Sequence, residues 1–156
     1  MADDVEIMKL EVTEDFRFDE YDRLFRSNDM KARGMVGLQL LNNIINGSPG
    51  ESVVAPILTG LLRGSGSVFV GSKVIGFSPR INNEGNPATV IREDPGVVTV
   101  AFNTGYAAKL HEYPFRPGPI SQQSGNVGYK FIIKHVSADR NELMDLYATF
   151  IRKNTV

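Results

Sequence analysis

The chain has 156 residues, 42% of them hydrophobic and 22% charged, and its 17 basic and 18 acidic residues leave a net charge of −1. This composition is typical of one globular domain that buries about 70% of its unfolded surface, and it excludes a disordered chain. The absence of cysteine excludes disulfides, thiolate zinc sites and cysteine nucleophiles, and the charge balance provides no basic stripe for nucleic acid. Without an apolar run of bilayer length or a signal peptide, we expect a cytoplasmic protein that makes no membrane contact.

Residues 1–156 are predicted to form a single domain. Within it, residues 1–28 are predicted to form an N-terminal arm and a short helix that precede the core. Residues 5–13 alternate loosely between apolar and polar, as in a strand or an extended arm. Residues 19–26 form a polar helical stretch of mixed charge, which we interpret as a solvated face or a protein contact. The next three residues, 27–29, are Ser, Asn and Asp, which favour the N-cap of a second helix. The core is therefore predicted to begin at residue 29.

The second helix is predicted to run to about Asn46. Its apolar residues recur at helical spacing on one face, and they are Met35, Leu38, Leu41, Ile44 and Ile45. Gly47 is suited to the position after the helix, and Pro49 prevents the helix from continuing.

Two β-hairpins are predicted after the helices. Residues 67–77 form two short apolar segments around Gly71-Ser72, a pair that suits a tight turn. Residues 89–91 and 97–103 form the second pair, which turns at Glu93-Asp94-Pro95-Gly96. The expected sheet therefore has about four antiparallel strands.

Two polar segments, 78–87 and 116–128, are predicted to be loops because Gly, Pro, Ser and Asn dominate them. The last element, residues 138–154, is an amphipathic helix with acidic residues early and basic residues late. Its apolar face contains Leu143, Leu146, Tyr147 and Phe150. The predicted fold class is α+β: a small antiparallel sheet packed by a long N-terminal helix, a short helix and a C-terminal helix.

The adjacent pair His111-Glu112 is the first chemical candidate, near the end of a short helical run that starts at Tyr106. It resembles the opening of the zincin pattern, but the position four residues after the histidine is Phe115. The other histidine, His135, is distant and spacing suggests no third ligand, so we expect neither a metal nor a cofactor. A Ser-His-Asp triad remains possible because its members can lie anywhere in a chain, although no serine occupies a Gly-x-Ser-x-Gly elbow.

Two glycine-rich segments, 59–67 and 66–73, are interpreted as turns and not as phosphate-binding loops. The second has glycines at phosphate-loop spacing, but Ser72-Lys73 inverts the required order of lysine and hydroxyl residue. The first segment lacks the lysine.

A series of short motifs then carries a family resemblance. The pattern P-x-x-TG-x-LR-x-S at 56–65 follows the long helix, and β-hairpins, "YAAKLHE" and a terminal "GYKFIIKHV...NELMDLYATFIRKN" come after it. This order resembles the neck, or tail-completion, proteins of long-tailed bacteriophages, a group that includes head-tail joining and minor capsid proteins. The resemblance covers residues 30–153. The segment 80–86 is a longer insertion than the family pattern, and residues 1–28 match nothing in it.

The resemblance implies a virion structural protein without catalysis, assembled in the host cytoplasm. Its copies would form a ring, commonly a hexamer, in the neck between capsid and tail. That ring would contact the portal-side connector protein and the tail tube protein while genomic DNA passes without specific binding. The residues that we assign to interfaces or structural motifs are Thr59, Gly60, Arg63, Tyr106, His111 and Glu112.

In this interpretation the 59–60 pair turns the backbone and Arg63 forms an ion pair between elements or subunits, for example with Glu112; a solvated Arg63 is the alternative. The competing function is a small enzyme in which His111-Glu112 is an acid/base pair and Arg63 binds an anionic substrate. A third hypothesis is a monomeric adaptor that binds through the 80–87 loop.

Overall fold

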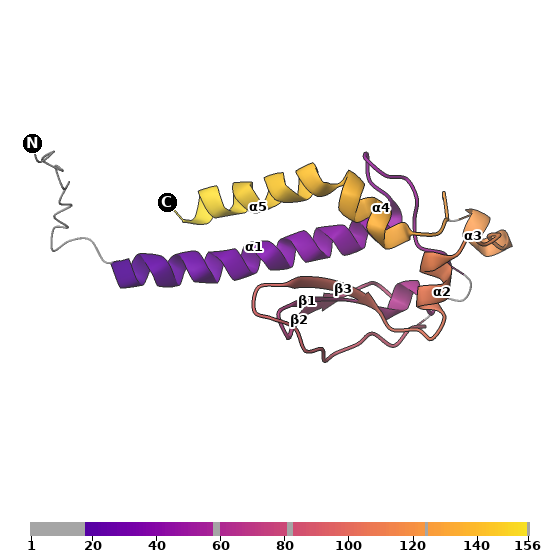
Figure 1. The fold of residues 1–156 in the computed structure, drawn as a ribbon, viewed down its shortest axis with the longest axis horizontal. Helices are drawn as coiled ribbons and strands as arrows, with labels where there is room; N and C mark the ends of the chain where they lie inside the picture. The colour runs from indigo at the N-terminus through magenta and orange to yellow at the C-terminus, as the bar shows by residue number, and fades with distance from the viewer. Residues whose placement is uncertain (1–17, 58–59, 81–82, 124, 156) are drawn as a thin grey trace, which may run out of the picture.

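The computed structural model describes residues 18–57, 60–80, 83–123 and 125–155, so the predicted arm at 5–13 lies outside the described residues. The elements are α1 (Phe18–Asn46), a 3-10 turn η1 (Arg63–Ser65), β1 (Gly66–Val70), β2 (Lys73–Phe77), β3 (Val98–Phe102), α2 (Ala107–Glu112), α3 (Pro119–Gln123), α4 (Phe131–Ala138) and α5 (Arg140–Asn154). The fold is α+β, as predicted: α1 packs on a three-stranded antiparallel sheet, with short helices and a C-terminal helix around it (Figure 1).

Helix α1 is a single helix of 29 residues, so the predicted boundary between two helices at 27–29 is wrong. The reason is that the expected capping residues make tertiary contacts instead. Asn28 is buried, and its Nδ2 donates a hydrogen bond to the carbonyl of Asn154, at 2.6 Å. The predicted end is confirmed: α1 stops at Asn46, and Gly47 has a φ of +82°, the left-handed conformation that glycine adopts readily at a helix end.

Helix α1 is the middle layer of the molecule, with α5 and α4 on one side and the sheet on the other (Figure 1). Glycines allow the close approach of α1 to the sheet. A Cβ atom at Gly37 would lie 2.4 Å from Val68 Cγ1, and one at Gly34 would lie 3.2 Å from Ile75 Cγ2. Because one helix packs against two layers, its apolar stripe alone does not define its buried surface.

The predicted apolar face of α1 is confirmed in part. Leu41 and Ile44 are buried, whereas Met35 and Leu38 are exposed to 38% and 40%. The sheet-facing positions that the prediction missed are Gly34 and Gly37, whose side chains carry no hydrophobic signal.

The sheet has the strand order β2-β1-β3, with β1 antiparallel to both neighbours. The first hairpin is confirmed, and Gly71 at its turn has a φ of +58°. The predicted strand at 89–91 is wrong, which leaves three strands among the described residues instead of four. Its neighbour Glu93 exchanges backbone hydrogen bonds with the Ser72 hydroxyl, at 3.2 and 3.3 Å, so this segment is tied to the β1–β2 turn and not to β3.

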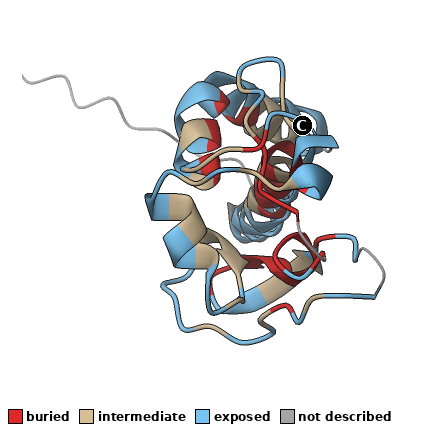
Figure 2. Ribbon diagram, turned by 90° about the vertical axis from the view of Figure 1, so that its right-hand side faces the viewer, coloured by how far each residue is buried: buried red, intermediate tan, exposed pale blue. Residues whose placement is uncertain are grey.

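The hydrophobic core lies where α1, η1 and α4 meet. Its buried cluster consists of Ile44, Ala55, Leu62 and Phe131, and Leu110 from α2 packs against it. Figure 2 shows buried residues concentrated between the helices and on the sheet. The predicted loop at 78–87 has no regular structure where it is described, but the predicted loop at 116–128 contains α3 and a short parallel bridge between Val54 and Val127. Within the described ranges, none of the helices combines the length and apolar character that crossing a membrane requires.

Candidate functional site

The His111-Glu112 pair lies on α2, the short helix that follows β3, as predicted. His111 Nδ1 is 2.8 Å from Glu112 Oε1, which assigns the ring proton to Nδ1 when the imidazole is neutral. The other nitrogen, Nε2, then accepts a hydrogen bond from the backbone N–H of Ile133, at 3.4 Å. Both ring nitrogens therefore have partners within the protein.

The His111 ring also packs edge-on against Phe131 of α4, with ring centroids 5.2 Å apart. The His111 carbonyl accepts a hydrogen bond from the Lys130 N–H, at 2.7 Å, immediately before α4 begins. The carbonyl, the imidazole ring and the Nε2 atom of His111 therefore all contact α4 or the residue before it. This arrangement is suited to positioning α2 against α4. Among the described residues, no group of three His, Asp or Glu side chains could hold a metal ion.

Arg63 lies at the start of η1 and is buried, which excludes the solvated alternative. Its Nε donates to the carbonyl of Ala55, at 2.8 Å, while Nη2 is buried without a hydrogen-bond partner. Glu112 is paired with its neighbouring histidine, so the suggested Arg63–Glu112 ion pair is replaced by these other contacts. Burial lowers the pKa of the Arg63 guanidinium. Gly60 has a φ of +97°, which supports its predicted role in the turn, and Thr59 lies outside the described residues.

Tyr106 precedes α2 and lines a pocket between α2 and α3, which we call the α2–α3 pocket. This pocket has a volume of about 480 Å³, and its lining residues are Pro56, Ile57, Leu62, Tyr106, Lys109, Leu110, Phe115, Arg116, Gly118 and Ser121. Burial raises the pKa of the Tyr106 hydroxyl, partly offset by a backbone hydrogen bond from Leu62. The side chains that line the pocket are mainly apolar, and its two charged residues are both basic.

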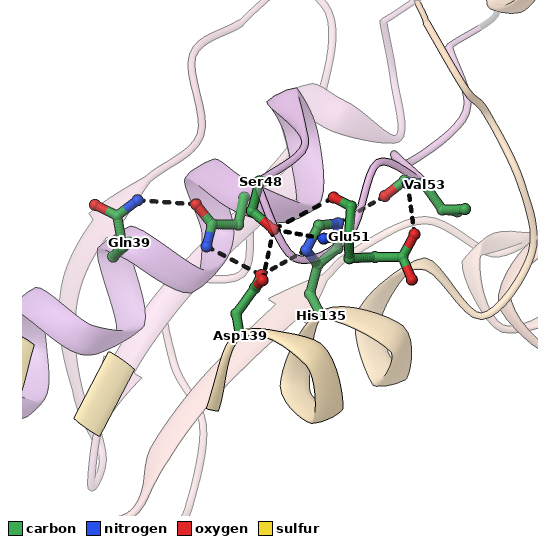
Figure 3. Close-up of polar contacts among 7 residues, drawn as sticks. Gln39, Ser48, Glu51, Val53, His135 and Asp139 are labelled. Atoms are coloured by element: carbon green, nitrogen blue, oxygen red, sulfur yellow. Dashed lines mark hydrogen bonds and ion pairs between the residues drawn. The ribbon is translucent and has the colours of Figure 1, made fainter. Parts of the chain in front are cut away.

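A buried polar network joins the end of α1 to the junction of α4 and α5 (Figure 3). His135 and Asp139 are 0% and 1% exposed, and His135 Nδ1 is 2.7 Å from Asp139 Oδ2. Asp139 also accepts hydrogen bonds from Ser48 Oγ, at 2.5 Å, and from Asn43 Nδ2, at 3.0 Å. His135 Nε2 is 2.6 Å from the carbonyl of Val53, an obligate acceptor. Since both nitrogens face acceptors, the imidazolium is the form that satisfies every contact.

This network contains Ser, His and Asp, yet its connectivity differs from that of a catalytic triad. In a triad the serine hydroxyl bonds to the histidine, whereas Ser48 bonds to the carboxylate of Asp139. Burial alone would raise the pKa of that carboxyl. Hydrogen bonds from Ser48, His135 and Asn43, with the charge on the imidazole, outweigh burial and hold the pKa below its usual range. The triad considered from composition is thus not formed by these residues.

The outer end of α1 is a further surface feature, and it lies in the stretch for which the sequence predicts a solvated face or a protein contact. Nine consecutive residues, Asp19–Ser27, are all exposed, and we call this segment the α1 tip. Tyr21, Leu24 and Phe25 within it are exposed to 50%, 47% and 39%. Figure 1 shows α1 extending past the end of α5 and past the sheet at this point. The sequence signal that could have identified the tip is the set of apolar residues at spacings of three and four within a charged stretch.

Comparison with models of protein families, with curated proteins and with solved structures gave no match.

Proposed function

We propose that this chain is a structural protein of a tailed bacteriophage virion whose copies form a ring in the neck, at the junction of head and tail. The observation that carries the proposal is the α1 tip. The tip continues α1 beyond its buried part, and a stripe of exposed aromatic and aliphatic side chains marks a surface that a partner covers. The tip therefore favours a function in assembly.

The order of elements supports the same proposal. A long helix, the turn at Gly60, an antiparallel hairpin, α2 and a C-terminal helix follow one another as the resemblance to neck proteins implies. Strands β2 and β3 lie at the two edges of the sheet, where a neighbouring copy can add a strand. The net charge of −1 is compatible with a channel that DNA passes without specific binding. The portal-side connector and the tail tube are the proposed neighbours.

The test is the mass of the purified protein by light scattering over a concentration series. The expected result is a closed assembly, with a hexamer at six times the subunit mass of 17.2 kDa. Substitution of Tyr21 and Phe25 by serine should reduce that mass, because the substitutions remove the exposed apolar contact. The control is Met144→Ser on α5, a residue that is 57% exposed and lies outside the tip. A wild-type protein that stays monomeric, and that also fails to bind a tail tube or connector, would contradict the proposal.

The His111-Glu112 pair allows a separate test against the enzymatic alternative. The double substitution His111→Ala and Glu112→Ala removes the Ile133 hydrogen bond and the ring contact with Phe131. We expect it to destabilise the fold by roughly 1–3 kcal/mol and to leave any background hydrolysis unchanged. Loss of a measurable hydrolytic activity with fold and assembly intact would favour the enzyme instead.

A further inference from the structure

Charge is distributed unevenly along the chain, although the total is near zero. The first 22 residues contain nine of the 18 acidic residues and two of the 17 basic ones. The remaining residues therefore carry nine acidic and 15 basic side chains. The excess of acidic residues lies before the α1 tip and at its start. The tip itself has three acidic and two basic residues, Arg23 and Arg26, and the body after the tip is basic. An acidic segment and a basic body attract each other, which favours contact between them.

The α2–α3 pocket is the place on the body that combines basic charge with an apolar lining. Lys109 and Arg116, its two charged residues, are exposed at the pocket. The apolar part of the lining includes Ile57, Leu62, Leu110 and Phe115. A volume of about 480 Å³ lies within the range of roughly 300–1,000 Å³ that is usual for ligand pockets. The chemistry that fits is a large apolar or aromatic side chain accompanied by carboxylates.

The α1 tip offers this chemistry. Tyr21 and Phe25 are spaced four residues apart, on the same helical face as Asn28 and Ala32, which are buried. Asn28 contacts the last residue of α5, so the face that α5 covers continues uncovered into the tip. Asp19 and Asp22 lie in the same two turns and are exposed. Asp22 also accepts a hydrogen bond from Arg26 Nε one turn later, at 2.8 Å, so the tip presents this carboxylate together with an arginine.

We propose that the α2–α3 pocket receives the α1 tip of a second copy of this chain. In this contact Tyr21 and Phe25 enter the pocket, and the acidic side chains of the tip face Lys109 and Arg116. The inference rests on the proposed function, because it requires self-assembly, and it adds which two surfaces meet.

The tip cannot enter the pocket of its own chain. Leu110 in the pocket packs against the cluster that contains Ile44. Asp19 and Ile44 belong to one helix and are 25 positions apart, so at a rise of about 1.5 Å per residue the start of the tip lies roughly 38 Å away along the axis. The donor must be another copy. A contact between opposite ends of identical subunits is head-to-tail, and it closes a ring when the rotation between subunits permits.

Charge exchange on exposed residues tests the inference. The pocket variant Lys109→Glu with Arg116→Glu should lose assembly at concentrations where the wild type is assembled, as measured by light scattering. Adding Asp19→Lys and Asp22→Lys to the same chain should restore the wild-type mass. A control with the same change in net charge, Arg152→Glu with Lys153→Glu at the end of α5, should keep it, because these exposed residues lie outside the pocket and the tip.

The outcomes separate the two proposals. Retention of the full mass by the pocket variant would overturn the inference and leave the proposed ring intact. Loss of assembly without recovery in the four-substitution variant would reject the tip as the occupant. A wild type that is monomeric at every concentration would overturn the inference, and the proposed function would then depend on binding of the protein to a tail tube or connector.

Cross-linking provides a second measurement. Because the chain has no native cysteine, only the introduced cysteines can form disulfides. Mild oxidation of the double variant Asp22→Cys with Arg116→Cys should produce a disulfide ladder that ends in a closed species. A mixture of the two single variants should stop at dimers. Dimers from Asp22→Cys alone, at the yield of the mixture, would indicate tip-to-tip pairing and would overturn the head-to-tail contact.

Discussion

The buried Asp139 carboxylate should be among the most destabilising positions to neutralise in this protein. The substitution Asp139→Asn keeps the size of the side chain but removes the charge that faces His135 at 2.7 Å. The amide can no longer accept on both sides from Ser48, Asn43 and the imidazole, so charge-assisted hydrogen bonds of the buried network are lost or left with a mismatched partner. At about 1.5–3 kcal/mol for each hydrogen bond to a charged group, the loss of roughly two of the three bonds lowers the free energy of unfolding by about 3–5 kcal/mol.

Urea unfolding measures this effect. With a slope near 2 kcal/mol per molar urea, within the usual range of about 1–3, the midpoint should fall by roughly 1.5–2.5 M. The matched control is Asp145→Asn on α5, an exposed aspartate that should change stability by no more than about 0.5 kcal/mol. If Asp139→Asn stays within about 1 kcal/mol of that control, the network does not have the energetic role assigned to it.

The same carboxylate predicts the direction of a pH dependence. Its pKa in the folded protein lies below the usual aspartate range near 4, so on acidification the unfolded chain takes up the proton first. The stability difference between wild type and Asp139→Asn should be complete above about pH 5 and should shrink as the pH falls through the folded pKa. A difference that grows on acidification would have the wrong sign.

The remaining predictions concern packing and a second hydrogen bond. Gly37→Ala should destabilise the fold by roughly 1–3 kcal/mol in thermal or urea unfolding, because its Cβ would lie 2.4 Å from Val68 Cγ1, whereas Gly105→Ala meets nothing within 4 Å and should be nearly neutral. Tyr147→Phe should cost roughly 1.5–3 kcal/mol, since the hydroxyl donates to the Asp29 carboxylate at 2.5 Å. That hydrogen bond, with burial, raises the pKa of Tyr147, so this stabilisation is present below about pH 10 and is lost as the pH rises through the folded pKa. Ultraviolet titration of wild type and Tyr147→Phe measures the shift.

Elements fixed by local chemistry were predictable from the sequence. Gly47 and Gly71 both adopt positive φ, and they determine where α1 ends and where the first hairpin turns. The failures come from contacts between distant residues. Residues 27–29 do not begin a helix, because Asn28 donates a hydrogen bond to α5 instead of capping. Residues 89–91 do not form a strand, because the nearby Glu93 is hydrogen-bonded to Ser72.

The candidate sites also separate into those set by neighbouring residues and those set by contacts between distant residues. The sequence located the His111-Glu112 pair and its helix, because both depend on neighbours in the chain. It did not locate the network around Asp139, which Asn43 joins from 96 residues away, although the spacing of four residues from His135 was visible. It also did not predict helix α4 or the α2–α3 pocket, since the pocket forms only when α3 and the residues after α1 come together.

The packing of α5 on α1 also determines when the fold can be completed during synthesis. Asn28 and Asn154 are 126 residues apart, and their contact closes one end of the layer that the two helices form. At a translation rate of about 5–20 residues per second, the α5-facing side of α1 stays uncovered for roughly 6–25 seconds after it leaves the peptidyl transferase centre. The sheet and its hairpin can form on α1 within that interval. The layer of α1 and α5 is therefore completed only after α5 has been translated and has reached α1.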